Sequence, residues 1–112
     1  MQRDREYLRD ILEAAKIALN YVSGMNREDF LDDLQCQDAV IRRLEIIGEA
    51  ARRISAKSQK KFSDLPWSDM IGMRNMMIHE YDGVDMYIIW ETVNTDLPPP
   101  IDVIEGILQT LE

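Results

Sequence analysis

The longest regular pattern in this chain lies in residues 36–55, which read CQDAVIRRLEIIGEAARRIS. Apolar residues recur there at steps of three and four, the spacing of one face of an α-helix. They are Cys36, Val40, Leu44, Ile47, Ala51 and Ile54. Charged residues occupy the opposite side, namely Arg42, Glu45, Glu49 and Arg52. The pattern predicts a long amphipathic helix that ends near Ser55 and packs its apolar face against other helices.

The residues before this helix follow the same spacing. Apolar side chains recur at helical intervals over residues 8–22, and Gly24 then provides a helix stop. Asn26 can cap a short helical turn, and either Asp32 or Asp33 can cap the long helix. We therefore expect a first helix that ends near residue 22 and a short turn before the long helix begins.

The second half of the chain predicts three more helices. A polar linker, AKSQKKFSD at 56–64, precedes Pro66, which suits the first turn of the next helix. The tripeptide YDG at 81–83 ends that helix, and two further helices are expected over about 84–95 and 101–111. The alternation typical of strands is absent. The expected fold is all-α, an up-and-down bundle of four to five helices.

Length and composition indicate one domain over residues 1–112, with 46% hydrophobic and 30% charged residues. No apolar run approaches the roughly 18 residues that a membrane span requires. The first ten residues, MQRDREYLRD, are charged throughout and do not resemble a signal peptide. We expect a cytoplasmic protein without membrane contact. A single cysteine, Cys36, excludes an internal disulfide and a multi-cysteine zinc site, and suits a small buried hydrophobe.

The net charge of −8 argues against a protein that coats nucleic acid by bulk attraction, and DNA is not an expected partner. The charge is uneven, however. Residues 42–61 hold seven basic and two acidic residues, a net charge of +5, whereas the rest of the chain carries −13. This basic strip could hold one polyanion or one acidic partner. It could equally be a solvated helix face with ion pairs such as Glu49 to Arg53, which needs no ligand.

The octapeptide RNMMIHEY, residues 74–81, contains the only histidine of the chain. The helix expected there has a core-facing stripe made of Trp67, Ile71, Ile78 and Tyr81. Arg74 falls in the middle of this stripe, so its charge must be paired or must open onto a cleft. Asn75, one turn before His79, could orient the imidazole, and Gly72 could let a backbone or a ligand approach closely. Arg74 and His79 are five residues apart, which separates them by about 140° on an ideal helix.

Each of these residues also has a purely structural interpretation. Arg74 could be an ion-pair partner of Glu45 or Glu49. His79 could cap the end of its helix by interacting with the helix dipole. Tyr81 could be a half-buried aromatic residue at a helix end. The methionines in and before the motif are more typical of an adaptable core or interface than of a cofactor site. These are Met70, Met73, Met76 and Met77.

The arrangement R-N-x-x-x-H-x-Y resembles the motif of the HEPN superfamily. Three flanking segments narrow the resemblance to HepT, the toxin of HEPN/MNT toxin–antitoxin pairs. They are RRLEIIGEAARRIS at 42–55, PWSDMIGMRN at 66–75 and YDGVDMYIIWETVNTDLPP at 81–99. The resemblance covers essentially all of the chain, and Arg74, Asn75, His79 and Tyr81 all match the motif.

The resemblance implies a homodimer in which two motifs face each other across a cleft at the subunit interface. It implies a ribonuclease that needs no metal and no cofactor, with Arg74 and His79 as catalytic residues and Asn75 in support. In related pairs the antitoxin is a minimal nucleotidyltransferase that transfers AMP from ATP to the motif tyrosine. We carry that role to Tyr81 as a hypothesis, because added phosphates would neutralise the cation that attracts RNA.

The residue types fit this chemistry independently. The sequence has no cluster of carboxylates and histidines for a metal, so RNA cleavage would use the substrate's own 2′-hydroxyl as the nucleophile. That reaction needs a proton acceptor, a proton donor and a cation over the phosphate. Arg74 can supply the cation, and a two-fold dimer brings two copies of His79 together, one as base and one as acid. The expected product is a 2′,3′-cyclic phosphate.

Two alternatives remain open at the level of sequence. The chain could be an accessory subunit without nuclease activity, whose Arg74 and His79 position ATP or the acceptor residue of a nucleotidyltransferase. The acidic net charge favours this alternative over a nuclease, which usually benefits from a basic approach surface. The other alternative is a structural dimer in which the motif forms a buried ion-pair network.

Overall fold

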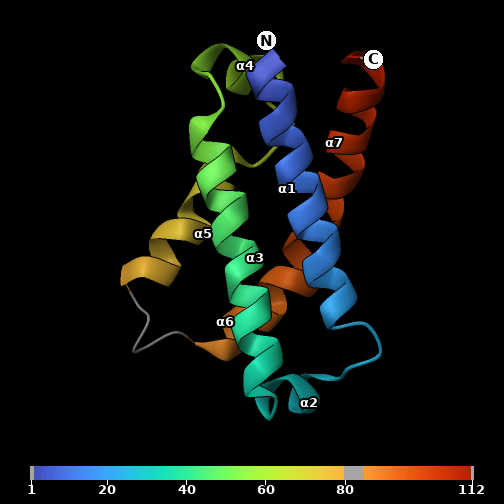
Figure 1. The fold of residues 1–112 in the computed structure, drawn as a ribbon, viewed down its shortest axis with the longest axis vertical. Coiled ribbons are helices and arrows are strands. Elements are labelled where there is room, and N and C mark those ends of the chain that lie inside the picture. The colour runs from blue at the N-terminus through green and yellow to red at the C-terminus, as the bar shows by residue number, and fades with distance from the viewer. Residues whose placement is uncertain (1, 80–84, 112) are drawn as a thin grey trace.

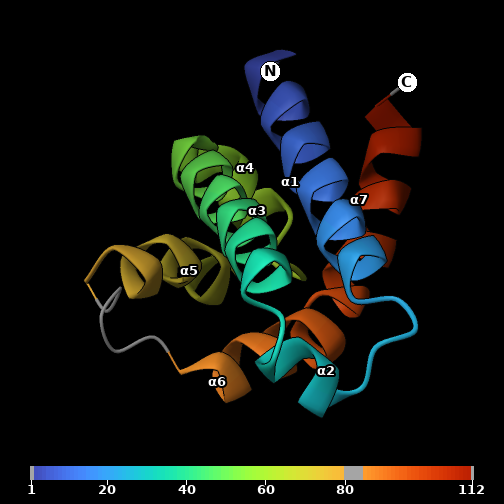
Figure 2. The ribbon, with the colours of Figure 1, turned by 60° about the horizontal axis from the view of Figure 1, so that its bottom comes forward.

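Four helices of 13 to 20 residues form the body of the molecule (Figure 1). The computed structural model describes residues 2–79 and 85–111, except for the side chains of residues 2 and 75–79. The four helices are α1 (Gln2–Tyr21), α3 (Leu34–Arg53), α5 (Trp67–His79) and α7 (Pro98–Leu111). Helix α1 packs between α3 and α7, and α5 packs against the opposite side of α3, an order that Figure 2 shows from a second direction.

Short helical segments connect these four helices. They are α2 (Arg27–Leu31), α4 (Ala56–Lys61), α6 (Met86–Glu91) and the π-helix η1 (Thr92–Asp96). Helix α2 contacts both α3 and α6, and η1 contacts α1 and α7. Residues 2–79 and 85–111 thus form seven α-helices and one π-helix without any strand, which confirms the all-α fold. None of the helices in these residues combines the length and the hydropathy of a membrane span.

The end of α1 and the starts of α2 and α3 lie where the sequence predicts. Gly24 follows α1 with a φ of 80°, a left-handed conformation that glycine adopts without steric cost. Asn26 forms a capping box at α2, because its side chain accepts the Asp29 amide at 2.8 Å while the Asp29 carboxylate accepts the Asn26 amide at 3.1 Å. Of the two candidate caps of α3, Asp33 is the one used, and it accepts the Cys36 amide at 2.9 Å.

The prediction of a polar linker at 56–64 is wrong for its first six residues, which form helix α4. Ser55 caps this helix by accepting the Ser58 amide at 3.2 Å. The Asp4 carboxylate of α1 then accepts the Ser55 amide at 3.1 Å and the hydroxyls of Ser55 and Ser58 at 2.6 Å each. These bonds span more than 50 residues of sequence, so local composition could not indicate that the segment is helical.

The C-terminal helices differ in detail from the prediction. The single helix expected over 84–95 is divided between α6 and the wider turn η1. The last helix begins at Pro98 instead of Ile101, so the prolines form its first turn, where a missing backbone N–H costs no hydrogen bond. The break predicted at 81–83 lies outside the described residues.

The core contains side chains from all four long helices. Those with at most 1% of their surface exposed include Leu8 and Ile11 of α1, Leu44 and Ile47 of α3, Met70 of α5 and Ile104 of α7. Each such side chain contributes about 2 kcal/mol through burial. Cys36 packs against this core but is only half-buried, and burial together with the charge of Asp33 raises the pKa of its thiol. A raised pKa agrees with a structural cysteine.

Candidate active site

Helices α3 and α5 approach each other closely at Gly48, in the C-terminal half of α3. A Cβ atom added to Gly48 would lie 2.6 Å from both the Cβ and the backbone nitrogen of Arg74. Only glycine fits this crossing, and it fixes the backbone of Arg74 against α3. Gly48 is not among the residues predicted for the site, although a glycine inside a helix costs about 1 kcal/mol relative to alanine and usually has a packing reason.

The close approach was instead predicted at Gly72. A Cβ atom added there would meet nothing within 4 Å. Gly72 lines a hollow of about 650 Å³ between α5, η1 and the start of α7, with Met70 and Met73 in its apolar lining. The charged residues that line it are all acidic, namely Asp64, Asp69 and Asp96. This hollow is therefore electrostatically unsuited to an RNA phosphate.

Helix α5 buries a different stripe from the predicted one. Met70 and Met73 are 1% and 6% exposed, whereas Trp67 and Ile71 are only partly buried. At 100° per residue, Arg74 lies about 70° from the centre of the stripe that Met70 and Met73 define. The prediction that Arg74 lies in the middle of the core-facing stripe is thus wrong. Its alkyl stem borders the core while its guanidinium reaches the surface.

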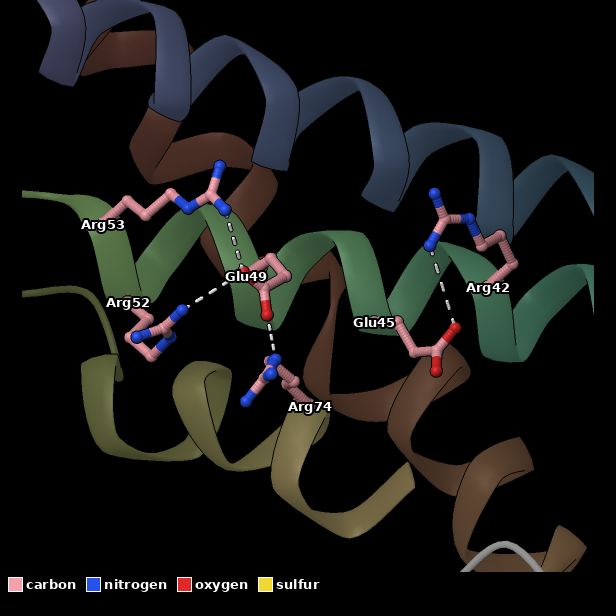
Figure 3. A network of polar contacts seen from close by, with 6 residues as sticks. All are labelled: Arg42, Glu45, Glu49, Arg52, Arg53 and Arg74. Atoms are coloured by element: carbon pink, nitrogen blue, oxygen red, sulfur yellow. Dashed lines mark hydrogen bonds and ion pairs between the residues drawn. The ribbon is translucent and has the colours of Figure 1, made fainter. Parts of the chain in front are cut away.

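Arg74 forms an ion pair with Glu49 of α3, and the two atoms that meet are Arg74 Nε and Glu49 Oε2 (Figure 3). This contact confirms one of the two structural partners expected for the arginine. Both side chains are 32% exposed, so the pair lies at the edge of the interface between α3 and α5 and is not sealed in the core. Within one subunit the pair is therefore not part of a fully buried network.

Glu49 binds two more arginines through its other oxygen. Arg52 Nη2 lies 3.3 Å and Arg53 Nη2 lies 3.4 Å from Glu49 Oε1. Three guanidinium groups therefore surround one carboxylate, and the four side chains together carry a net charge of +2. We call Glu49, Arg52, Arg53 and Arg74 the arginine cluster. The expected ion pair between Glu49 and Arg53 is confirmed.

The predicted site residues can be located to different extents. Arg74 is placed with its side chain. Asn75 and His79 belong to α5, and His79 is its last residue, but their side chains lie outside the described part of the structure. Tyr81 lies outside the described residues altogether. Because α5 is helical through His79, helix geometry separates the positions of Arg74 and His79 by about 140° around its axis.

A resident metal would need several donor side chains at one place. Within residues 2–79 and 85–111, wherever side chains are described, no three histidine, cysteine, aspartate or glutamate residues gather in that way. The arginine cluster has the opposite character, since guanidinium groups bind carboxylates and phosphates through paired N–H donors. The chemistry that these described residues can offer is the binding of an anion.

Comparison with known proteins places this helical chain in a class of small ribonucleases. The chain is a member of the HepT-like family, whose model, described as ribonuclease HepT-like, matches residues 11–107. It is 43% identical to the "Probable ribonuclease HepT" of Thermococcus cleftensis, over 84% of this chain and 86% of that protein. It is 39% identical to a provisionally named RNase of Caldanaerobacter subterraneus, over 97% of both chains. No solved structure gives a significant match.

Proposed function

We propose that this protein is a metal-independent endoribonuclease and the toxin of a HEPN/MNT toxin–antitoxin pair. It acts as a homodimer through the motif RNMMIHEY at 74–81. Membership of the HepT-like family supports ribonuclease activity. The observation that carries the proposal is the position of Arg74, the motif arginine, which reaches the surface at 32% exposure among other arginines. A phosphodiester can approach a cation in this position, which it could not do in a sealed core.

The proposed reaction is an in-line transfer within the RNA strand. One His79 removes the proton from the 2′-hydroxyl, whose oxygen forms a bond to the adjacent phosphorus. The bond from phosphorus to the 5′-oxygen breaks, and His79 of the partner subunit donates a proton to that oxygen. Arg74 stabilises the added negative charge on the phosphate oxygens. The products are a 2′,3′-cyclic phosphate and a free 5′-hydroxyl.

Helix geometry supports a site shared between two subunits. The positions of Arg74 and His79 diverge by about 140° around α5, so one subunit does not present both residues on one face. One chain also supplies only one histidine, whereas the reaction needs a base and an acid. A two-fold axis near the end of α5 would bring two histidines and two arginines to the same phosphodiester.

The decisive experiment compares RNA cleavage by the wild-type protein and by His79→Ala, with circular dichroism to show that the variant folds. We expect the substitution to reduce cleavage by about 10²-fold or more, because it removes both the base and the acid. Cleavage by the wild type should also depend on pH, since the two histidines must be in opposite protonation states. A flat profile between about pH 5 and 9 would contradict the shared roles.

Control of the toxin would depend on Tyr81. We propose that the antitoxin transfers AMP to the Tyr81 hydroxyl, which places phosphate groups beside the motif cation and blocks RNA. The transfer forms a bond between the tyrosine oxygen and the α-phosphorus of ATP and releases pyrophosphate. Mass spectrometry of the protein co-expressed with the antitoxin should show added AMP. If Tyr81→Phe still gains AMP, another residue is the acceptor.

The second candidate function is an accessory subunit that binds a nucleotide or positions a nucleotidyltransferase. The net charge of −8 favours it, since a nuclease usually benefits from a basic approach surface. This candidate predicts nucleotide binding without cleavage. Calorimetric titration with ATP, on a preparation whose RNA cleavage has been assayed, separates the two functions.

A further inference from the structure

The contact between Glu49 and Arg74 uses one particular edge of the guanidinium. Glu49 Oε2 meets Nε, the nitrogen nearest the alkyl stem. The terminal nitrogens Nη1 and Nη2 of Arg74 are not the atoms that make this contact. These two atoms form the terminal fork of the guanidinium, whose parallel N–H groups match two oxygens of one phosphate. The ion pair therefore orients Arg74 and leaves its phosphate-binding edge available.

Charge is unevenly compensated among the other two arginines of the cluster. Arg53 lines a hollow of about 190 Å³ between α1 and α3, together with Arg42, Asp10 and Glu49. Two arginines and two carboxylates share that hollow, so its net charge is zero. Arg52 does not line it, and Figure 3 shows Arg52 on the side of Glu49 that faces α5, where Arg74 also lies. Arg53 thus has a second carboxylate, Asp10, in its hollow, whereas the arginine cluster provides Arg52 and Arg74 with Glu49 alone.

We propose that Glu49 is a positioning residue for the ribonuclease and that Arg52 and Arg74 form a two-arginine phosphate site at the crossing of α3 and α5. Glu49 holds Arg74 so that its terminal fork faces the scissile phosphate, and Arg52 binds a neighbouring phosphate of the same single strand. Arg53 balances the charge of Glu49 and does not contact RNA. The role of Glu49 rests on the proposed function, whereas the phosphate site can be tested without cleavage.

The first test measures binding alone. The probe is a fluorescein-labelled single-stranded RNA in which every 2′-hydroxyl is methylated, so that it cannot be cleaved. Fluorescence anisotropy at several salt concentrations gives the slope of log Kd against log salt. Arg52→Ala should weaken binding and reduce the slope by about 0.7, the value for one phosphate contact to a single strand. Arg53→Ala is the matched control, because it removes the same charge from the same carboxylate one residue away, and it should leave the slope unchanged.

The second test uses Glu49→Gln, which keeps the shape of the side chain and removes its charge. The variant should bind the methylated RNA as tightly as the wild type or more tightly, because the cluster gains one positive charge. With cleavable RNA, kcat should fall by about tenfold or more without a rise in KM, since a displaced Arg74 no longer meets the transition state. A merely structural role would lower the melting temperature and leave the kcat of the folded protein unchanged.

The outcomes separate the two proposals. If Arg52→Ala and Arg53→Ala change the salt slope equally, or if neither changes it, the phosphate site is overturned whether or not the protein cleaves RNA. If the wild type cleaves RNA and Glu49→Gln keeps its kcat, the positioning role is overturned while the ribonuclease stands. If the wild type binds the probe through Arg52 but cleaves no RNA, the ribonuclease fails, and with it the role of Glu49 in catalysis, while the phosphate site survives.

Discussion

Two carboxylates of this protein, Asp4 and Glu49, each interact with three donor groups, but the donors differ in charge. Asp4 is buried at 8% exposure and accepts one backbone N–H and two serine hydroxyls. Glu49 is 32% exposed and pairs with three guanidinium groups. The donors of Asp4 are neutral, and each has a single hydrogen, which it donates to Asp4. Each guanidinium, in contrast, is positively charged and has further N–H groups.

The difference shows how a carboxylate can hold together polar groups of the interior in one place and gather positive charge at a surface in another. Around Asp4, polar groups of α1 and α4 satisfy each other in the interior, which fixes the corner between α3 and α4. Around Glu49, a single negative charge gathers three positive ones at a surface, which leaves a net attraction for an anion. We therefore expect substitution of Asp4 to affect mainly stability, and substitution of Glu49 to affect mainly activity.

The largest expected effect on stability belongs to Asp4→Ala. It leaves the hydroxyl of Ser58 and the amide of Ser55 without their acceptor, which should lower the free energy of unfolding by about 2 to 3 kcal/mol. Denaturation with urea gives this quantity, and Asp102→Ala, at an exposed position of α7, is the control. Cleavage per folded molecule should remain at the wild-type level. A variant that keeps its stability and loses cleavage would contradict the expectation that Asp4 acts mainly on stability.

Gly48→Ala should affect both properties, because Gly48 adjoins Arg74. The added methyl group would lie 2.6 Å from the backbone nitrogen of Arg74, so α5 must shift away from α3. We expect a loss of about 1 to 3 kcal/mol in unfolding free energy, the range for an overpacked contact. Cleavage should fall too, since Arg74 moves relative to Glu49.

The control for this substitution is Gly106→Ala on α7, where a Cβ atom would meet nothing within 4 Å. It should stabilise the protein by up to about 1 kcal/mol, because alanine loses less backbone entropy than glycine in a helix. If Gly48→Ala behaves in the same way as Gly106→Ala, the helices do not cross as closely as described.

The smallest expected effect is the loss of stability at low pH that comes from the Asp4 carboxyl. Burial acts to raise the pKa of the Asp4 carboxyl, but the hydrogen bonds from Ser55 and Ser58 outweigh it, so that the pKa lies below its ordinary value of 3.8. The stabilisation is complete above that value. As the pH falls through 3.8 the unfolded carboxyl takes up protons before the folded one, and the stabilisation is lost once the pH is below the folded pKa.

Comparison of the wild type with Asp4→Asn isolates this contribution. Asp10, whose pKa is raised by burial and by the charges of Glu13 and Glu6, affects both proteins alike. The stability difference between wild type and variant, measured by urea denaturation, should be constant from neutral pH to about pH 5 and should shrink below it. A difference that grows in acid would mean that Asp4 is stabilised in its protonated form.

The sequence predicts those features of the fold that depend on local chemistry. Gly24, Asn26 and Asp33 each act on backbone groups within three or four residues, and all three occupy the roles expected of them. Helix α4 was missed because its cap at Ser55 is held by Asp4 from the other end of the sequence. A contact of that kind has no local signature.

In the candidate site, too, local features could be predicted from the sequence and contacts between distant helices could not. Glu49 was one of two expected partners of Arg74, because both lie on the charged side of α3. The sequence did not indicate Gly48, nor the difference between Arg52 and Arg53, because both depend on how α5 and α1 flank α3. The roles of Asn75, His79 and Tyr81 are predictions still, since their side chains lie outside the described structure.

The π-helix η1 explains an unusual spacing of apolar residues near the C-terminus. Ile89, Val93, Leu97 and Ile101 are all buried, although they follow one another at three successive steps of four residues. In an uninterrupted α-helix, each such step would drift by about 40°, and the series would wind away from the core. Between Thr92 and Leu97 the backbone bonds one residue further along than an α-turn does, at 3.1 Å. The wider turn compensates for this drift, so apolar residues spaced by four can all face the core. A repeated spacing of four is therefore the sequence pattern that accompanies the π-turn in this chain.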